Sequence, residues 1–371
     1  MSVVTVDLVA AARPNFMKVA PLYKAMMKDG GSMSPRLIHT GQHYDENMSG
    51  AFFRDLELPE PYVHLGVGSG SHAEQTGRVM IAYEDFCMKD RPDWTVVVGD
   101  VNSTMACALA AKKLLIPIAH LEAGLRSRDV TMPEEINRIV TDTIADLLWT
   151  PSEDADENLE REGVSKQRIH RVGNIMIDTL EMMRPKFELG GLRKKLGLEK
   201  KPYIVVTLHR PSNVDDRAKL EELTEMLVSI AGKLRLIFPV HPRTRERLLS
   251  YGLWESLNKA RDISLLEPVG YVDFMSLVFQ SSGVLTDSGG IQEETTYLGI
   301  PCLTLRSTTE RPITVEIGTN RLVKPIDVLP SIERIIRKQW PRGCKPDLWD
   351  GKTAARVLAS LGEAINQRCR A

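Results

Sequence analysis

Short apolar runs alternate with amphipathic stretches along nearly the whole chain, and this alternation limits the fold more than any other feature of the sequence. A chain that alternates strands and helices in this way forms parallel βαβ units with right-handed crossovers. The expected strands cover residues 3–9, 36–39, 95–98, 118–121 and 148–150 in the first half, and 203–207, 236–240, 263–265, 283–286 and 302–305 in the second. The sequence therefore predicts an α/β fold with parallel sheets.

The length of 371 residues exceeds one typical domain and fits two. In the first half, helical patterns separate the strands at residues 16–28, 47–56, 73–88, 103–115, 134–145 and 153–161. We place one domain at residues 1–172 and a second at residues 173–351, with a helix at 352–371 that completes the first. We expect two doubly wound Rossmann-like domains that face a central cleft, because such sheets bind ligands at the carboxyl ends of their strands.

Composition excludes several classes of function. The formal net charge is -1, so nothing suggests binding to nucleic acid or to an anionic membrane, and an anion site requires a local cluster. The five cysteines form no CxxC pair, which argues against a disulfide framework and a zinc site. The apolar run at residues 3–12 has no basic residue before it and is too short to span a bilayer. We expect a buried strand there, in a cytoplasmic protein.

Glycine-rich segments do not indicate a nicotinamide cofactor or a P-loop. The cluster at residues 66–70 lacks both the G-x-G-x-x-G spacing and a convincing preceding strand, and no GxxxxGK[ST] segment occurs. No constellation of metal ligands stands out either. We therefore expect neither a cofactor nor a metal.

The segment T-D-S-G-G-I-Q-E-E at residues 286–294 predicts a binding site. It indicates the end of a buried strand, then Ser288-Gly289 and a helix that starts at about Gly290. Such a helix start presents unpaired N–H groups and the positive end of the helix dipole, and glycine lets an anion approach the backbone. Glu294 lies just over one turn inside, where a carboxylate can accept both hydroxyls of a ribose. An ordinary helix start with Ser288 as N-cap explains the same pattern.

Titratable side chains follow most other expected strands, at the edge where open α/β sheets bind ligands. Structural explanations compete with this reading. Asp100 can cap the following helix, and Glu134 has the spacing of a capping box with Thr131. His209 and His241 can be interior histidines. The cations that would supply the positive potential for a diphosphate are Arg13, Lys18, Arg210, Arg243, Arg306 and Arg311.

The chain resembles the non-hydrolysing UDP-N-acetylglucosamine 2-epimerases in a series of motifs that occur in the same order. These are ARPNFMKVAPL, TGQHYD, GDVNST, HLEAGLRS, PEEINR, VTLHRPSN, FPVHPRTRE and LTDSGGIQEE, followed by TTERP. The match runs from about residue 3 to residue 325. The resemblance implies a fold of the glycosyltransferase-B type. It also implies a homodimer that interconverts UDP-N-acetylglucosamine and UDP-N-acetylmannosamine without metal or nicotinamide.

The resemblance further implies a route in which UDP leaves, a glycal forms, and UDP adds back with a proton delivered to the other face. By motif, the catalytic carboxylates are Asp100, Glu122 and Glu134, and His209 assists at the diphosphate or as an acid. The motifs do not decide which carboxylate removes the proton. The implied nucleotide ligands are Arg13, Lys18, His241, Ser288, Gly289, Gly290, Glu294 and Arg311, to which the strand-end position adds Arg243.

Departures from the family pattern concern regulation by a second substrate molecule, which many bacterial members bind. Gln42 and Arg210 match the residues of that allosteric site. Asp45 stands at a position where a second glutamine is usual, and Glu74 stands at an arginine position, which argues against this regulation.

Other functions stay open from the sequence. They are a hydrolysing relative that releases N-acetylmannosamine and UDP, an epimerase of a UDP-diacetamido-glucuronic acid, and a glycosyltransferase of the same architecture. A nucleotide-sugar sensor without catalysis is a further alternative, against which the three carboxylates argue.

Overall fold

The computed structural model describes residues 3–41, 55–199 and 201–368, with the side chain of Arg13 excepted. The chain divides into two compact units, one of Met1–Met182 with Asp347–Ala371 and one of Met183–Pro346. This division falls inside α7 (Ile175–Glu188), whereas the sequence analysis placed the junction near residue 173. Most of the expected helix at residues 47–56 lies outside the described residues.

The first unit is built on a sheet of seven parallel strands in the order β3-β2-β1-β4-β5-β6-β7. Its strands are β1 (Val4–Ala10), β2 (Met33–His39), β3 (Val63–His64), β4 (Trp94–Val98), β5 (Ile118–Leu121), β6 (Leu147–Thr150) and β7 (Ile169–Arg171). Central strands such as β4 and β5 are buried at every residue, as expected for a parallel sheet covered on both faces.

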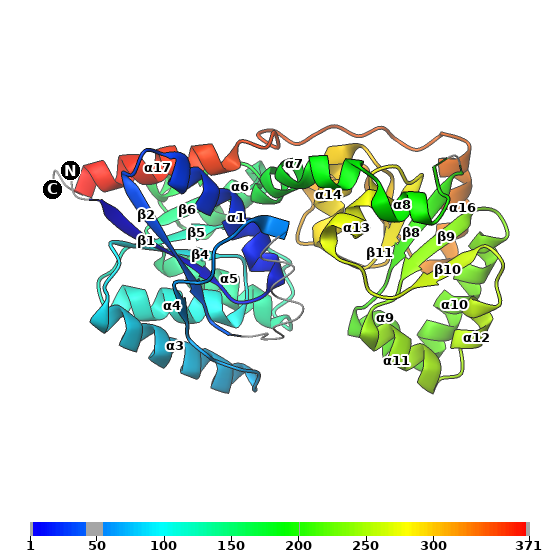
Figure 1. The fold of residues 1–371 in the computed structure, drawn as a ribbon, viewed down its shortest axis with the longest axis horizontal. Coiled ribbons are helices and arrows are strands. Elements are labelled where there is room, and N and C mark those ends of the chain that lie inside the picture. The colour runs from blue at the N-terminus through cyan, green and yellow to red at the C-terminus, as the bar shows by residue number, and fades with distance from the viewer. Residues whose placement is uncertain (1–2, 42–54, 200, 369–371) are drawn as a thin grey trace. The chain divides into compact units, whose positions relative to one another are not determined.

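Helices cover both faces of this sheet (Figure 1). α3 (His72–Lys89) and α4 (Asn102–Lys113) pack on one face, where Tyr83 and the alanines of α4 meet strand residues such as Val97. α1 (Arg13–Lys28) and α17 (Thr353–Arg368) contact each other on the opposite face. Further helices of this unit are α5 (Pro133–Ile144), α6 (Glu153–Arg161) and the short η1 (Lys166–Arg168).

The C-terminal helix α17 is tied to the first unit by side chains far from it in sequence. The Asp178 carboxylate, on α7, accepts hydrogen bonds from the backbone N–H groups of Thr353 (3.1 Å) and Ala354 (2.8 Å). N–H groups at a helix start have no partner within the helix, so this carboxylate satisfies them. The Trp149 indole in β6 donates to Ser360 Oγ at 3.0 Å.

The second unit has a sheet of six parallel strands in the order β10-β9-β8-β11-β12-β13. Its strands are β8 (Tyr203–Thr207), β9 (Arg235–Pro239), β10 (Ile263–Leu266), β11 (Gly283–Thr286), β12 (Cys302–Thr304) and β13 (Asn320–Leu322). Its helices are α8 (Gly191–Lys195), α9 (Pro211–Val214), α10 (Arg217–Ala231), α11 (Pro242–Ser250), α12 (Trp254–Asn258), α13 (Tyr271–Val278), α14 (Gly290–Leu298), α15 (Ile313–Glu316) and α16 (Pro325–Ile336). α10 and α16 share one apolar core with the sheet, and α13 and α14 lie on the opposite face (Figure 1).

Each sheet reverses its strand order once, between β1 and β4 in the first unit and between β8 and β11 in the second. Doubly wound sheets bind ligands outside the carboxyl ends of the strands at this switch point. The predicted fold class of two doubly wound α/β domains is confirmed. Every expected strand is present, with ends within a few residues of the prediction. Among the described residues, no helix is long and apolar enough to cross a membrane.

Candidate functional site

The turn after β4 brings several candidate residues of the first unit together. Gly99 follows the strand with a φ of 69°, a conformation that favours glycine. A Cβ at this position would lie 3.1 Å from Lys18 Nζ and 3.6 Å from Glu122 Oε2. The turn that carries Asp100 therefore passes close to the Lys18 and Glu122 side chains, and a larger residue at Gly99 would press against Lys18 Nζ.

Lys18 and Glu122 form an ion pair with little exposure to solvent. Lys18 comes from α1, and Glu122 directly follows β5. The backbone of Glu122 has a φ of 72°, in the left-handed region that non-glycine residues rarely adopt. Strain of this kind costs on the order of 1 kcal/mol and persists where the surrounding structure holds a side chain in a required position. The strain therefore marks Glu122 as a functional candidate.

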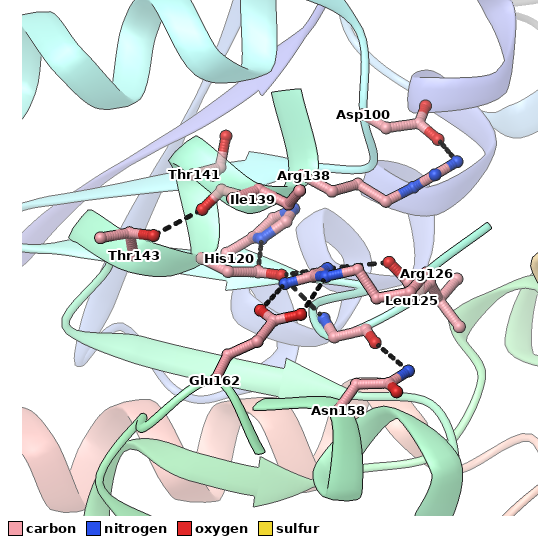
Figure 2. Close-up of polar contacts among 12 residues, drawn as sticks. Asp100, His120, Leu125, Arg126, Arg138, Ile139, Thr141, Thr143, Asn158 and Glu162 are labelled. Carbon is pink, nitrogen blue, oxygen red and sulfur yellow. Dashed lines mark hydrogen bonds and ion pairs between the residues drawn. The ribbon is translucent and has the colours of Figure 1, made fainter. Parts of the chain in front are cut away.

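Asp100 pairs with Arg138 of α5, as Figure 2 shows, and about a third of its side chain is exposed. It does not cap the following helix, because the N-cap of α4 is Val101 and no side chain caps that helix. The prediction that Asp100 could cap this helix is therefore wrong. Arg138 itself is almost completely buried.

Glu135, which the sequence analysis did not select, is the buried acid at the start of α5. It forms an ion pair with Arg138 at 2.7 Å and accepts hydrogen bonds from the N–H groups of Ser127 and Arg128, both at 2.9 Å. Burial alone would raise the pKa of Glu135, but these donors outweigh it and hold the pKa below its ordinary value. Glu135 thereby fixes the arginine that meets Asp100.

Glu134 lies one position earlier, within the first turn of α5, and is half-buried. The capping box with Thr131 does not form: the N-cap is Met132, no side chain caps the helix, and the Thr131 hydroxyl donates to Asp129 at 2.6 Å. The positive end of the helix dipole favours an ionised carboxylate in this first turn.

The side chain of His120, in β5, contacts the backbone of the Gly99 turn. Its Nε2 lies 2.8 Å from the Gly99 carbonyl oxygen, and its Nδ1 lies 2.6 Å from an oxygen of Asp142. Asp142 also pairs with Arg126, which in turn bonds Glu162 (Figure 2). The buried His120 and Asp142 side chains link the turn to α5 and fix its position.

In the second unit, Asp287 organises the edge between β8 and β11. This fully buried carboxylate accepts hydrogen bonds from the N–H groups of His209 (3.0 Å) and Arg210 (2.9 Å) and from the Asn213 amide (3.1 Å). Burial alone would raise the pKa of Asp287, but the hydrogen bond from the His209 side chain and these donors lower it. The His209 Nδ1 is 3.0 Å from Asp287 and must be the donor to this carboxylate. Nε2 is then the nitrogen left for a ligand.

His241 lies beside His209, with ring centroids 5.5 Å apart. Burial and then the neighbouring His209 lower the pKa of His241. Its ring accepts a hydrogen bond from the Arg243 N–H at 3.3 Å, as the N-cap of α11. The Arg243 side chain instead bonds Asp215, at 3.0 Å from its Nε.

α14 begins at Gly290, as predicted, but Ser288 is not its cap. The N-cap is Gly289, and the Ser288 N–H donates to Thr286 Oγ1 at 2.9 Å. A Cβ on Gly289 would lie 2.6 Å from Glu310 Oε1, so a larger residue would have to displace the Glu310 carboxylate. The start of α14 therefore carries no side-chain cap on its N–H groups.

Arg311 lies against this helix start in a buried group of charges. It pairs with Glu293 at 2.7 Å and with Glu310 at 2.8 Å, and Glu310 also pairs with Arg306 at 2.9 Å. Burial alone would raise the pKa of Glu310, but Arg311 and Arg306 outweigh it and lower the pKa to about 2. Arg306 and Arg311, which the sequence singled out as cations for a diphosphate, are thus each paired with a glutamate in the structure.

Glu294 is buried on the same helix and accepts a hydrogen bond from the Tyr271 hydroxyl at 2.7 Å. Burial raises the pKa of Glu294 to about 7, while the hydrogen bond from Tyr271 opposes the shift. Tyr271 was missed by the sequence analysis because no local pattern links it to a residue on another helix.

The side chains of two predicted site residues, Gln42 and Arg13, are not described by the structure. Gln42 lies outside the described residues, and Arg13 is placed only by its backbone, at the first position of α1. Arg210, the other candidate of the allosteric pair, directs its Nε to the Asp287 carbonyl oxygen at 3.0 Å. The described residues contain no group of three or more histidines, cysteines or acids that could hold a metal ion.

The fold and these sites define a protein of the glycosyltransferase-B type, whose two Rossmann-like units each carry charged groups at the switch point of a parallel sheet. Over residues 25–362, the sequence matches the UDP-N-acetylglucosamine 2-epimerase family. The chain belongs to this family.

Individual relatives match almost the whole chain. The UDP-N-acetylglucosamine 2-epimerase of Methanocaldococcus jannaschii is 40% identical over 363 residues, which cover 96% of this chain and 98% of the relative. A crystal structure of the enzyme from that organism, in complex with UDP-GlcNAc and UDP, gives a TM-score of 0.86 at 39% identity and covers 97% of this chain and 99% of that one. The UDP-2,3-diacetamido-2,3-dideoxy-D-glucuronate 2-epimerase of Pseudomonas aeruginosa is 40% identical over 319 residues, with 85% and 87% covered.

Proposed function

We propose that the protein is an isomerase that interconverts UDP-N-acetylglucosamine and UDP-N-acetylmannosamine by inverting carbon 2 of the sugar. The observation that carries the proposal is the gathering of Asp100, Lys18 and Glu122 at the carboxyl edge of the first sheet. Family membership and the match to an enzyme of this name over 96% of the chain support it.

The reaction explains why carboxylates are needed. The proton on carbon 2 is only weakly acidic, because no adjacent carbonyl stabilises a carbanion. Expulsion of UDP develops positive charge on the sugar ring, after which the proton is lost and a glycal forms. UDP then adds back while a proton is delivered to the opposite face. Carboxylates stabilise the positive charge and move protons, and an anion site holds the departing diphosphate.

The roles divide between the two units. Asp100, Glu122 and Glu134 supply the carboxylates, and the exposure of Asp100 and the strain at Glu122 support this assignment. His209 directs Nε2 to the diphosphate, since Nδ1 is bound to Asp287. The N–H groups at the start of α14, which no side chain caps, hold a phosphate, Arg311 lies beside them, and Glu294 binds the ribose. The other proposed nucleotide ligands are Arg13, Lys18, His241, Arg243, Ser288, Gly289 and Gly290.

Incubation with UDP-N-acetylglucosamine in heavy water tests the function. We expect deuterium at carbon 2 and formation of the manno epimer while the UDP-sugar persists, because the proton returns from solvent. NMR spectroscopy of the sugar measures both. Stoichiometric release of UDP with free N-acetylmannosamine would instead identify a hydrolysing enzyme. A transferase would require an acceptor and would show no exchange at carbon 2.

A second candidate substrate follows from the Pseudomonas aeruginosa relative, whose name specifies UDP-2,3-diacetamido-2,3-dideoxy-D-glucuronate. Its 40% identity equals that of the Methanocaldococcus jannaschii enzyme, so identity does not separate the two sugars. The ratio of kcat/KM values for the two UDP-sugars decides between them. A homodimer is also proposed from the family resemblance, and light scattering in solution measures it. The cytoplasmic location expected from the sequence stays a proposal.

Glu294 makes UDP binding depend on pH. Its pKa of about 7 in the free protein lies above the ordinary value of 4.5. The contribution of Glu294 to the stability of the unliganded fold is therefore present at low pH and is lost as the pH rises through 7.

Ribose hydroxyls donate to the ionised form of Glu294, so UDP binding at pH 6 should release about one proton from Glu294, and none at pH 8. Calorimetry in buffers of different ionisation enthalpy measures the release. Because UDP itself titrates near pH 6, the difference between the wild type and Glu294→Gln gives the proton from Glu294. Equal release by both would contradict the assignment.

A further inference from the structure

Glu294 has one hydrogen-bond donor among the described residues, and this donor comes from another helix. Tyr271 is the first residue of α13, and its hydroxyl lies 2.7 Å from Oε1 of Glu294 on α14. The neighbouring Glu293 is bound to Arg311 instead. The orientation of the Glu294 carboxylate in the free protein is therefore set by the Tyr271 hydroxyl.

We infer that Tyr271 is a positioning residue that orients Glu294 for the two ribose hydroxyls and so makes the nucleotide site select ribose over 2′-deoxyribose. The inference rests on the proposed function, because it requires Glu294 to bind the ribose of UDP.

The chemistry of a carboxylate explains how Glu294 can bind Tyr271 and two ribose hydroxyls at once. Two oxygens offer about four lone-pair positions, and two vicinal hydroxyls need two of them on the same side of the group. A side chain that rotates about its last bond presents these positions only part of the time. The hydrogen bond to Oε1 fixes the rotation and leaves Oε2, with the second lone pair of Oε1, for a ligand. Because Glu294 is almost completely buried, the hydrogen bond is strong and a missing donor is costly.

Replacement of Tyr271 by Phe should therefore affect ribonucleotides most. In the wild type, 2′-deoxy-UDP should bind about tenfold more weakly than UDP, since a buried carboxylate loses one donor. In Tyr271→Phe, UDP should bind about tenfold more weakly, 2′-deoxy-UDP should change less, and the ratio of the two Kd values should fall toward one. The KM for the UDP-sugar should rise while kcat stays unchanged, because the ribose contact is equal in the ground and transition states.

Tyr203→Phe is the matched control. The Tyr203 hydroxyl donates to the Leu277 carbonyl oxygen at 2.6 Å and so binds the same helix, α13, without touching Glu294. If Tyr271 only anchored α13, both variants would weaken UDP and 2′-deoxy-UDP by equal factors. We expect the ratio of Kd values to change in Tyr271→Phe alone.

Calorimetric titration of the wild type and both variants with UDP and 2′-deoxy-UDP measures the Kd values that test the inference. A wild type that does not bind UDP overturns the proposed function. A wild type that binds UDP and 2′-deoxy-UDP equally overturns the ribose role of Glu294, and the inference with it. A wild type that prefers UDP, together with an unchanged preference in Tyr271→Phe, overturns the role of Tyr271 and leaves the proposed function standing.

Discussion

Asp100→Asn and Glu122→Gln should each reduce turnover by about a hundredfold or more, while the Kd for UDP changes little. Each amide keeps the shape of the side chain but neither accepts the proton nor stabilises positive charge on the sugar ring. UDP affinity should largely persist because most of the proposed nucleotide ligands, among them the α14 N–H groups, Arg311 and Glu294, belong to the second unit. NMR spectroscopy of the UDP-sugar measures turnover, and calorimetric titration measures the Kd.

The ion pairs of these carboxylates require a control. Asp100→Asn weakens the pairing of buried Arg138, and Glu122→Gln weakens that of Lys18, so a loss of folding must be separated from a loss of chemistry. Glu162→Gln is matched to them, because Glu162 also pairs with a buried arginine of the first unit (Figure 2). We expect it to leave kcat near that of the wild type. A folded Asp100 or Glu122 variant with the wild-type rate would refute the catalytic assignment.

The loop between β11 and α14 was predictable from sequence because the responsible signals are local. An apolar run that ends in T-D-S-G-G specifies a strand, a turn and a helix start within nine residues, and the structure places α14 at Gly290 as predicted. The identity of the cap was not predictable, because Ser288 and Gly289 both suit an N-cap position. The short strands β3, β7 and β13 were missed, since their sequences VH, IHR and NRL contain polar or charged residues and do not form apolar runs.

The hydrogen-bond and ion-pair partners of the candidate residues could not be predicted from local sequence patterns. Glu134 and Glu135 are adjacent acids at a helix start, and only packing against Ser127 and Arg128 makes the second one buried. Arg138 was likewise indistinguishable from an exposed helical arginine. Hydrogen bonds between distant segments depend on tertiary structure, which hydrophobic periodicity does not report.

Arg36→Leu should lower the free energy of unfolding of the first unit by about 3 to 5 kcal/mol. Arg36 in β2 lies opposite Asp7 in β1, with 2.7 Å between Nε and Oδ1, and Asp7 is fully buried. Removal of the arginine leaves Asp7 with the Tyr83 hydroxyl at 3.0 Å as its remaining donor among the described residues. Urea denaturation followed by circular dichroism measures the loss, with hydrogen exchange of β1 and β2 to assign it to the first unit.

The pH dependence of this loss has a definite sign. Burial raises the pKa of Asp7 to about 6 even with Arg36 present, so its contribution to stability is complete below pH 4 and is lost as the pH rises through 6. Without Arg36 the pKa of Asp7 must rise further, and Arg36→Leu should be more destabilising at pH 8 than at pH 5. Equal losses at the two pH values would show that Asp7 is not the source of the penalty.

Two further variants separate the buried charge from the lost packing of Arg36. Arg161→Leu removes an exposed arginine that pairs with Glu157 on α6, and it should change stability by less than about 1 kcal/mol. Asp7→Val combined with Arg36→Leu should recover much of the stability that Arg36→Leu loses, because apolar side chains can replace both partners of a buried ion pair at little cost. A double variant as unstable as Arg36→Leu would mean that the contacts of Arg36 with the Tyr62 and Phe86 rings, rather than the isolated carboxylate, account for the loss.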